Sequence, residues 1–87
     1  MTLTECKTVY SALNKQIHKD RYRYEPEIIS DLYIEKPVEE RFFYVRLHAN
    51  GYRLSRLEDL MGIADAVIDG VMFEVQAKDN KPIFDIY

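Results

Sequence analysis

"RFFYVRLHANGYRLSRLED", residues 41–59, decides the fold, because alternating apolar runs lie on both sides of Asn50 and Gly51. A two-residue type I′ turn requires positive φ at both central positions, which Asn and Gly tolerate best. The stretch therefore predicts a β-hairpin over residues 41–54 in which Ala49 pairs with Tyr52. One face of this hairpin would be apolar, with Phe43, Val45, Leu47, Ala49, Tyr52 and Leu54, and the other would carry Phe42, Tyr44, Arg46, His48 and Arg53.

Two helices are predicted where a capping box precedes apolar residues at helical spacing. Thr2 with Glu5 begins the first helix, and Ser55 with Glu58 begins the second, almost directly after the hairpin. The predicted buried stripes are Leu3, Cys6, Val9, Tyr10, Leu13 and Ile17 in the first helix and Leu57, Leu60, Met61, Ala64, Val67 and Ile68 in the second.

Further strands are predicted on either side of this unit. Residues 27–34, "EIISDLYI", fit a strand or a short helix begun by Pro26, and we favour the strand because it would pair with the next segment through the turn at "EKPVEE". Gly70 provides a left-handed helix stop, after which "VMFEVQA" and "PIFDIY" flank "KDNK" as a second hairpin. The predicted order is α-β-β-β-α-β-β, a single α+β domain over residues 1–87 whose antiparallel sheet is packed by two helices.

The composition is that of a folded protein, with 47% apolar residues, 31% charged residues and a net charge of −3. No apolar run reaches the roughly 18 to 20 residues of a membrane span, and no leader segment precedes a cleavage site. The single cysteine, Cys6, cannot form an internal disulfide. These features predict a cytoplasmic protein without a membrane partner.

Charge is segregated into blocks along the chain. Residues 1–24 carry +3, residues 25–40 carry −5, residues 41–56 carry +4 and residues 57–87 carry −5. Such blocks either neutralise one another within the fold or polarise the surface for a charged partner. In the second case the acidic 25–40 block would serve as a lid or as a second contact.

The sequence offers little catalytic equipment. Cys6, His18 and His48 lie too far apart for a zinc site, and Cys6 falls on the apolar stripe of the first helix, where a thiol is a buried hydrophobe. The three glycines are isolated, so no phosphate-binding loop exists, and adjacent carboxylates point apart. We therefore predict no metal, no cofactor and no enzymatic activity.

A basic and aromatic face is the main candidate for binding. Arg46 and Arg53 would converge beside the hairpin turn, and Arg56 would join Arg53 at the N-terminus of the second helix, where unpaired N–H groups favour anions. That anion would belong to a protein partner, to RNA or DNA stacked on the aromatic rings, or to the protein's own acidic residues. The candidate partner-binding residues are Phe42, Tyr44, Arg46, His48, Arg53 and Arg56.

The last strand is a second candidate interface. In "PIFDIY", Ile83 and Tyr87 face one way while Phe84 and Ile86 face the other, so the strand is apolar on both sides. Such a strand is either enclosed within a sheet or is an edge that another chain covers, for example in a homodimer.

The segment "RLHANGYRL", residues 46–54, resembles the hairpin of the RelE/HigB ribonuclease toxins. The resemblance covers nine residues and implies mRNA cleavage by arginine, histidine and tyrosine side chains. Those toxins are typically strongly basic and have their sheet mostly after a helical hairpin. This chain is acidic and has predicted strands between its helices.

Together these patterns predict a non-enzymatic protein that binds another macromolecule, with a protein as its partner. Small domains of this kind serve as regulators, inhibitors or accessory factors, including those that phages and other mobile elements carry. Binding of RNA or DNA through the 41–54 face is the alternative. An acidic chain gains little non-specific attraction to a polyanion, which favours the protein partner.

Overall fold

The chain alternates single helices with pairs of strands in the order α1-β1-β2-α2-β3-β4. The structure is a computed structural model and describes residues 1–20, 24 and 28–87. The helices are α1 (Leu3–Lys19) and α2 (Leu54–Val67), and the strands are β1 (Ile29–Glu35), β2 (Tyr44–Ala49), β3 (Phe73–Gln76) and β4 (Ile83–Ile86). The predicted α+β class is confirmed, with one strand fewer than expected.

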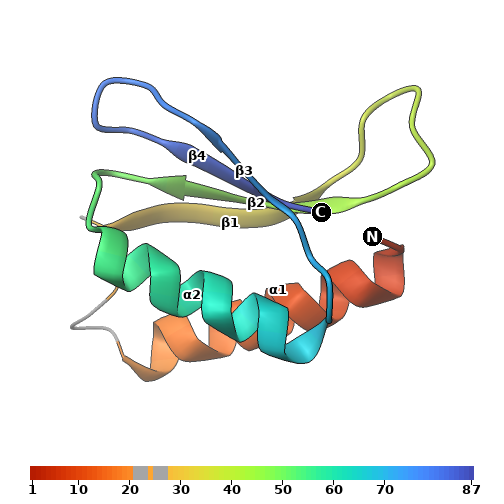
Figure 1. Ribbon diagram of the computed structural model, residues 1–87, viewed down its shortest axis with the longest axis horizontal. Coiled ribbons are helices and arrows are strands. Elements are labelled where there is room, and N and C mark those ends of the chain that lie inside the picture. Colours follow the sequence, from red (N-terminus) through yellow and green to blue (C-terminus); the bar gives the residue numbers. More distant parts are fainter. Residues whose placement is uncertain (21–23, 25–27) are drawn as a thin grey trace.

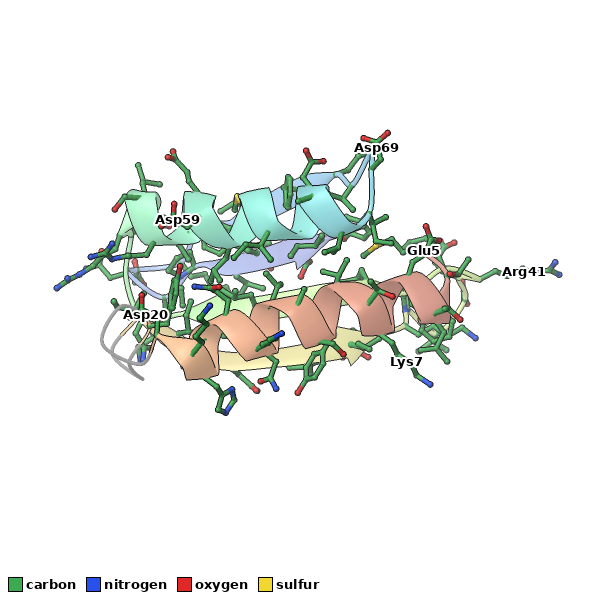
Figure 2. The ribbon with its side chains drawn as sticks, turned by 90° about the horizontal axis from the view of Figure 1, so that it is seen from below. Glu5, Lys7, Asp20, Arg41, Asp59 and Asp69 are labelled. Atoms are coloured by element: carbon green, nitrogen blue, oxygen red, sulfur yellow. The ribbon has the colours of Figure 1, made fainter. Side chains whose placement is uncertain are left out.

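Both helices lie on the same face of the sheet, as Figure 1 shows. Seen from the helix side in Figure 2, α1 and α2 run next to each other in front of the strands. Each helix buries the middle of its predicted stripe against the apolar side of the central strands, whereas Leu3 and Val67, at the ends of the stripes, are 40% exposed. The buried residues are Cys6, Val9 and Leu13 of α1, Leu57, Leu60 and Ala64 of α2, and Val45, Leu47, Phe84 and Ile86 of the sheet. The opposite face of the sheet has no helix over it in the part of the chain that the structure describes.

The two helices begin in different ways. The predicted capping box of α1 is confirmed, because the Thr2 hydroxyl accepts the Glu5 amide at 3.1 Å and the Glu5 carboxylate accepts the Thr2 amide at 3.0 Å. The predicted box at Ser55 is wrong. The N-cap of α2 is Arg53, two residues before Ser55, and its side chain makes no capping bond. Ser55 already lies within the helix and therefore cannot cap it.

The sheet order is β1-β2-β4-β3, and all neighbouring strands are antiparallel. Joining the C-terminus to the N-terminus would convert the chain order to β4-α1-β1-β2-α2-β3, the order of the ferredoxin-like split β-α-β arrangement. The two termini lie together in Figure 1, where the backbone of Met1 bonds to that of Phe43 and the ring of Tyr87 contacts Phe42. In this sheet order, β2 and β4 are the central strands.

The predicted hairpin over residues 41–54 is wrong. Both edges of β2 are occupied, by β1 on one side and β4 on the other, so residues 52–54 have no place beside it. Asn50 and Gly51 end β2 without the positive φ that a type I′ turn requires, and Tyr52 and Leu54 are exposed. The hairpin implied by the resemblance to the RelE/HigB toxins is therefore not formed at residues 46–54.

Strand β1 takes the place next to β2 that the hairpin was expected to fill. The ambiguous segment is a strand, as we favoured, and it pairs with β2 through the loop of residues 36–43. A bulge at Ser30 and Asp31 shifts the alternation, so that Ile29 and Leu32 both pair with core residues of β2. Seven residues of the acidic 25–40 block, Ile29–Glu35, form strand β1, so this part of the block belongs to the sheet and is no lid. Pro26, with which the alternative short helix would begin, lies outside the described residues.

The second predicted hairpin is confirmed as β3 and β4. Its turn contains Asp79 (φ 30°) and Asn80 (φ 61°), which provide the left-handed backbone that a tight turn needs. Gly70 has the predicted left-handed conformation, with a φ of 79°, but α2 already ends at Val67 with Ile68 as its C-cap, so Gly70 lies in the turn after the helix and does not stop it. Strand β4 is enclosed between β2 and β3, so of the two alternatives left open for it the enclosed strand is confirmed, and Ile83, Phe84, Ile86 and Tyr87 do not form an edge for another chain.

Candidate functional site

The helix-free face of the sheet, called here the uncovered face, is built of three transverse rows of side chains. The rows follow from the antiparallel registers, because directly opposite residues point to the same side of a sheet. The tyrosine row consists of Glu35, Tyr44, Tyr87 and Met72, the ion-pair row of Tyr33, Arg46, Asp85 and Glu74, and the histidine row of Asp31, His48, Ile83 and Gln76.

An ion pair lies at the centre of this face. The Arg46 Nε donates to Asp85 Oδ1 at 2.8 Å, and its terminal nitrogen donates to Oδ2 at 3.0 Å. The guanidinium also lies 5.2 Å from the centre of the Tyr44 ring. Asp85 is only 1% exposed, and its hydrogen bonds raise the pKa of Arg46 above the usual range. The bidentate pair fixes both side chains to the sheet and neutralises Arg46 within the fold.

The histidine row is joined to the ion-pair row through Tyr33. The Tyr33 hydroxyl and His48 Nε2 are 2.9 Å apart, and the two rings stack with a centroid distance of 5.6 Å. Since Tyr33 stands opposite Arg46, these side chains form one continuous polar layer across β1, β2 and β4. Their ionisable groups contact one another, which gives this part of the face a structural role.

The tyrosine row forms an apolar end to the face. The rings of Tyr44 and Tyr87 lie 5.1 Å apart, and Phe42 meets Tyr87 edge-on at 5.8 Å. Next to them, Met72 exchanges two backbone hydrogen bonds with Tyr87 and is 71% exposed, while Phe42 is 37% exposed. We call Phe42, Tyr44, Met72 and Tyr87 the aromatic anchor, because it combines fixed rings with apolar surface open to solvent.

Burial in the anchor changes the titration of its tyrosines. It raises the pKa of Tyr44, and it raises the pKa of Tyr87 from 10.0 to about 12, because the tyrosinate would lose solvation and would face Asp85 and Glu74.

We therefore expect the free energy of unfolding to decline as the pH rises from 10 to 12. A Tyr87 pKa that is higher in the folded chain stabilises the fold fully below pH 10, and this contribution is lost as the pH passes through 12. The loss should be on the order of 1 to 2 kcal/mol, allowing for solvent screening of a partly exposed ring. Urea unfolding at a series of pH values measures it. In Tyr87→Phe this decline of the free energy of unfolding should be smaller, whereas in Tyr52→Phe, at an exposed ring, it should equal that of the native chain. Equal curves for the native chain and Tyr87→Phe would contradict the assignment of the decline to Tyr87.

The structure brings together only some of the predicted site residues. Phe42, Tyr44, Arg46 and His48 lie on the uncovered face or at its end, as the alternation along β2 predicted. Arg53 and Arg56 lie instead at the start of α2, in the helix layer, so the predicted convergence of Arg46 with Arg53 does not occur. The partners that the sequence did not reveal are Tyr33, Met72, Glu74 and Asp85. A signal was present for Asp85 alone, as a single charge within the apolar strand "PIFDIY".

The β1–β2 loop, residues 36–43, rises at the anchor end of the uncovered face, away from the helices (Figure 1). The base of the loop makes two contacts. Lys36 Nζ lies 5.7 Å from the centre of the Phe43 ring, and the backbone of Phe43 is hydrogen-bonded to that of Met1. Its tip presents Val38, which is 100% exposed. The Arg41 side chain extends away from the rest of the protein in Figure 2.

Other kinds of site find no support among the described residues. No group of three or more His, Cys, Asp or Glu side chains comes close enough to hold a metal ion there. Cys6 is fully buried in the core, and burial raises the pKa of its thiol. Neither of the two described helices is long and apolar enough to cross a membrane.

The fold and the uncovered face define a small two-layer α+β protein with one free sheet surface. Comparison of the chain with protein-family models, with curated proteins and with solved structures gives no match.

Proposed function

We propose that this chain is a non-enzymatic binding protein, a regulator, inhibitor or accessory factor that engages another protein through the uncovered face of its sheet. The observation that carries the proposal is the aromatic anchor. Met72 at 71% and Phe42 at 37% exposure flank two tyrosine rings in contact with each other, on a face without a helix. Aromatic residues and methionine are enriched in the cores of protein interfaces, where they dominate binding energy.

The polar part of the face supports a binding role over a catalytic one. Arg46 is held by Asp85 and His48 by Tyr33, so these groups are engaged with each other. A preformed polar layer of this kind keeps the anchor rigid, which lowers the entropy lost on association. The buried thiol of Cys6 suits the reducing cytoplasm, which is the compartment that we propose for the protein.

The charge of the face favours a protein over a nucleic acid. Arg46 is the one guanidinium in the three rows, which also hold the carboxylates of Asp31, Glu35, Glu74 and Asp85. Phosphate contacts dominate nucleic-acid affinity, and a face with this charge would repel a phosphate backbone. The alternative is binding of RNA or DNA through stacking on the aromatic rings. The following experiment distinguishes it from binding of a protein.

A photo-crosslinking amino acid at position 72 should form a discrete adduct in a lysate of the cells that encode this chain. We expect an adduct that resists nuclease and is digested by protease, because position 72 is the most exposed part of the anchor. The matched control places the same amino acid at position 67 of α2, where Val67 is exposed on the helix layer, and should give no such adduct. Phe42→Ala combined with Met72→Ala should weaken the captured complex about tenfold or more.

Three outcomes would contradict this proposal. An adduct sensitive to nuclease would favour the nucleic-acid alternative. The same adducts from positions 72 and 67 would show that contact is not confined to the uncovered face. A captured complex whose affinity does not change in the double alanine variant would exclude the aromatic anchor as its binding surface.

A further inference from the structure

The uncovered face carries negative charge around its apolar end. The Arg46 guanidinium is already neutralised by Asp85, so the remaining carboxylates of the rows set the charge that a partner meets. Glu35 stands directly opposite Tyr44 at the β1 side, and Glu74 stands one row from Tyr87 at the β3 side. The anchor is therefore bordered by an acidic residue on each of the two outer strands.

Each of these carboxylates lies next to an aromatic ring. Burial is the main cause of the raised pKa of both Tyr44 and Tyr87, and the charge of Asp85 adds to it; Glu35 raises the pKa of Tyr44 further, and Glu74 that of Tyr87. The loop that rises beside the anchor adds two exposed acidic residues, Glu39 and Glu40, next to the fully exposed Val38. The loop also carries two cations: Lys36 lies beside the Phe43 ring at its base, and the Arg41 side chain extends away from the protein (Figure 2).

The uncovered face already binds one guanidinium group, that of Arg46. Arg46 combines two hydrogen bonds to one carboxylate with a position 5.2 Å from the centre of a tyrosine ring. This combination of carboxylate and ring binds arginine more strongly than either alone. Glu35, Glu74 and the partly exposed rings of Phe42 and Tyr87 offer the same two chemical groups at the surface.

We propose that the partner presents a segment rich in lysine and arginine to this face, with apolar side chains seated on the aromatic anchor. Charge complementarity carries the inference, since carboxylates border an exposed apolar centre and attract a basic segment while they repel an acidic one. The inference rests on the proposed function and names the chemistry of the partner that the uncovered face would bind.

The test uses two synthetic peptides of equal length, one alternating arginine with leucine and the other alternating glutamate with leucine. We expect the arginine peptide alone to shift backbone amide signals of the ¹⁵N-labelled full chain, with the shifts confined to β1, β2, β4 and residues 72–74. Glu35→Gln combined with Glu74→Gln should weaken binding about fivefold, because the two charges that border the anchor are lost.

The matched control is Glu58→Gln combined with Asp65→Asn, which removes two exposed acidic residues from α2 on the other side of the sheet. This variant should bind the arginine peptide as the native chain does. Equal weakening in both variants would show only a long-range effect of net charge and would overturn the inference, as would binding of the glutamate peptide or no binding of either peptide. If the crosslinked protein at position 72 is found while the arginine peptide fails to bind, the proposed function stands and the basic partner does not.

Discussion

Arg46→Met should lower the free energy of unfolding by about 3 to 5 kcal/mol, because it leaves the Asp85 carboxylate buried without a counter-charge. Asp85 is 1% exposed, and both of its oxygens accept hydrogen bonds from Arg46. A domain of this length is stable by about 4 to 13 kcal/mol, so the variant loses a large share of its stability. Urea unfolding followed by circular dichroism measures the change.

The matched variants separate loss of the pair from loss of a positive charge. Arg46→Met combined with Asp85→Leu should recover most of the stability, because an apolar pair of similar volume replaces a buried ion pair at little cost. Arg53→Met, at the exposed start of α2, should change the stability by less than about 0.5 kcal/mol. A cost below about 1 kcal/mol for Arg46→Met would mean that the ion pair is not formed in solution. The ion pair also matters for binding experiments. A substitution of Arg46 leaves Asp85 without its partner, so a loss of binding in such a variant would reflect unfolding and not a lost contact with the partner protein.

Phe84→Ala should cost about 3 to 5 kcal/mol, as expected for a large side chain removed from a core. Phe84 lies in the middle of β4, is 4% exposed and stands between Leu47 of β2 and Val75 of β3. A cavity there would open beneath the strand that holds Asp85 and Tyr87 in place. The measurement is again the urea midpoint, with the slope checked for unchanged two-state behaviour.

The control for this prediction is Val75→Ala, on the strand residue that pairs directly with Phe84. Val75 belongs to the edge strand β3 and is 48% exposed, so its truncation should cost less than about 1 kcal/mol. Similar costs for the two variants would contradict the central position of β4 and the enclosure of its apolar side.

Several elements could be predicted because their signals are local. The Thr2–Glu5 box depends on groups three residues apart, and the stripe of α1 depends on helical periodicity alone. The turn at Asp79 and Asn80 likewise lies within the four residues between two short apolar runs. The alternation along β2 correctly placed Tyr44, Arg46 and His48 on one side of the sheet, whichever strands lay next to it.

The candidate site could be predicted only in part, because its other members come from strands distant in sequence. Arg46 and Asp85 are separated by 39 residues, and the contact between them exists only because β4 enters the sheet between β2 and β3. Met72 joins the anchor only through its backbone pairing with Tyr87. Neither juxtaposition leaves a local pattern in the sequence.

The sequence by itself determined the α+β class, the two amphipathic helices, the cap of α1 and which side chains of β2 share a face. Only the tertiary structure decided which strands pair. The Asn50–Gly51 signal favoured a hairpin, in which residues 52–54 would pair with β2 over only three residues. Strand β1 instead provides a strand of seven residues beside β2 and adds two apolar side chains, Leu32 and Ile34, to the core beneath the helices. The choice of partner strand depends on backbone bonds and apolar area summed over the whole sheet, and a turn preference of two residues is small beside that sum.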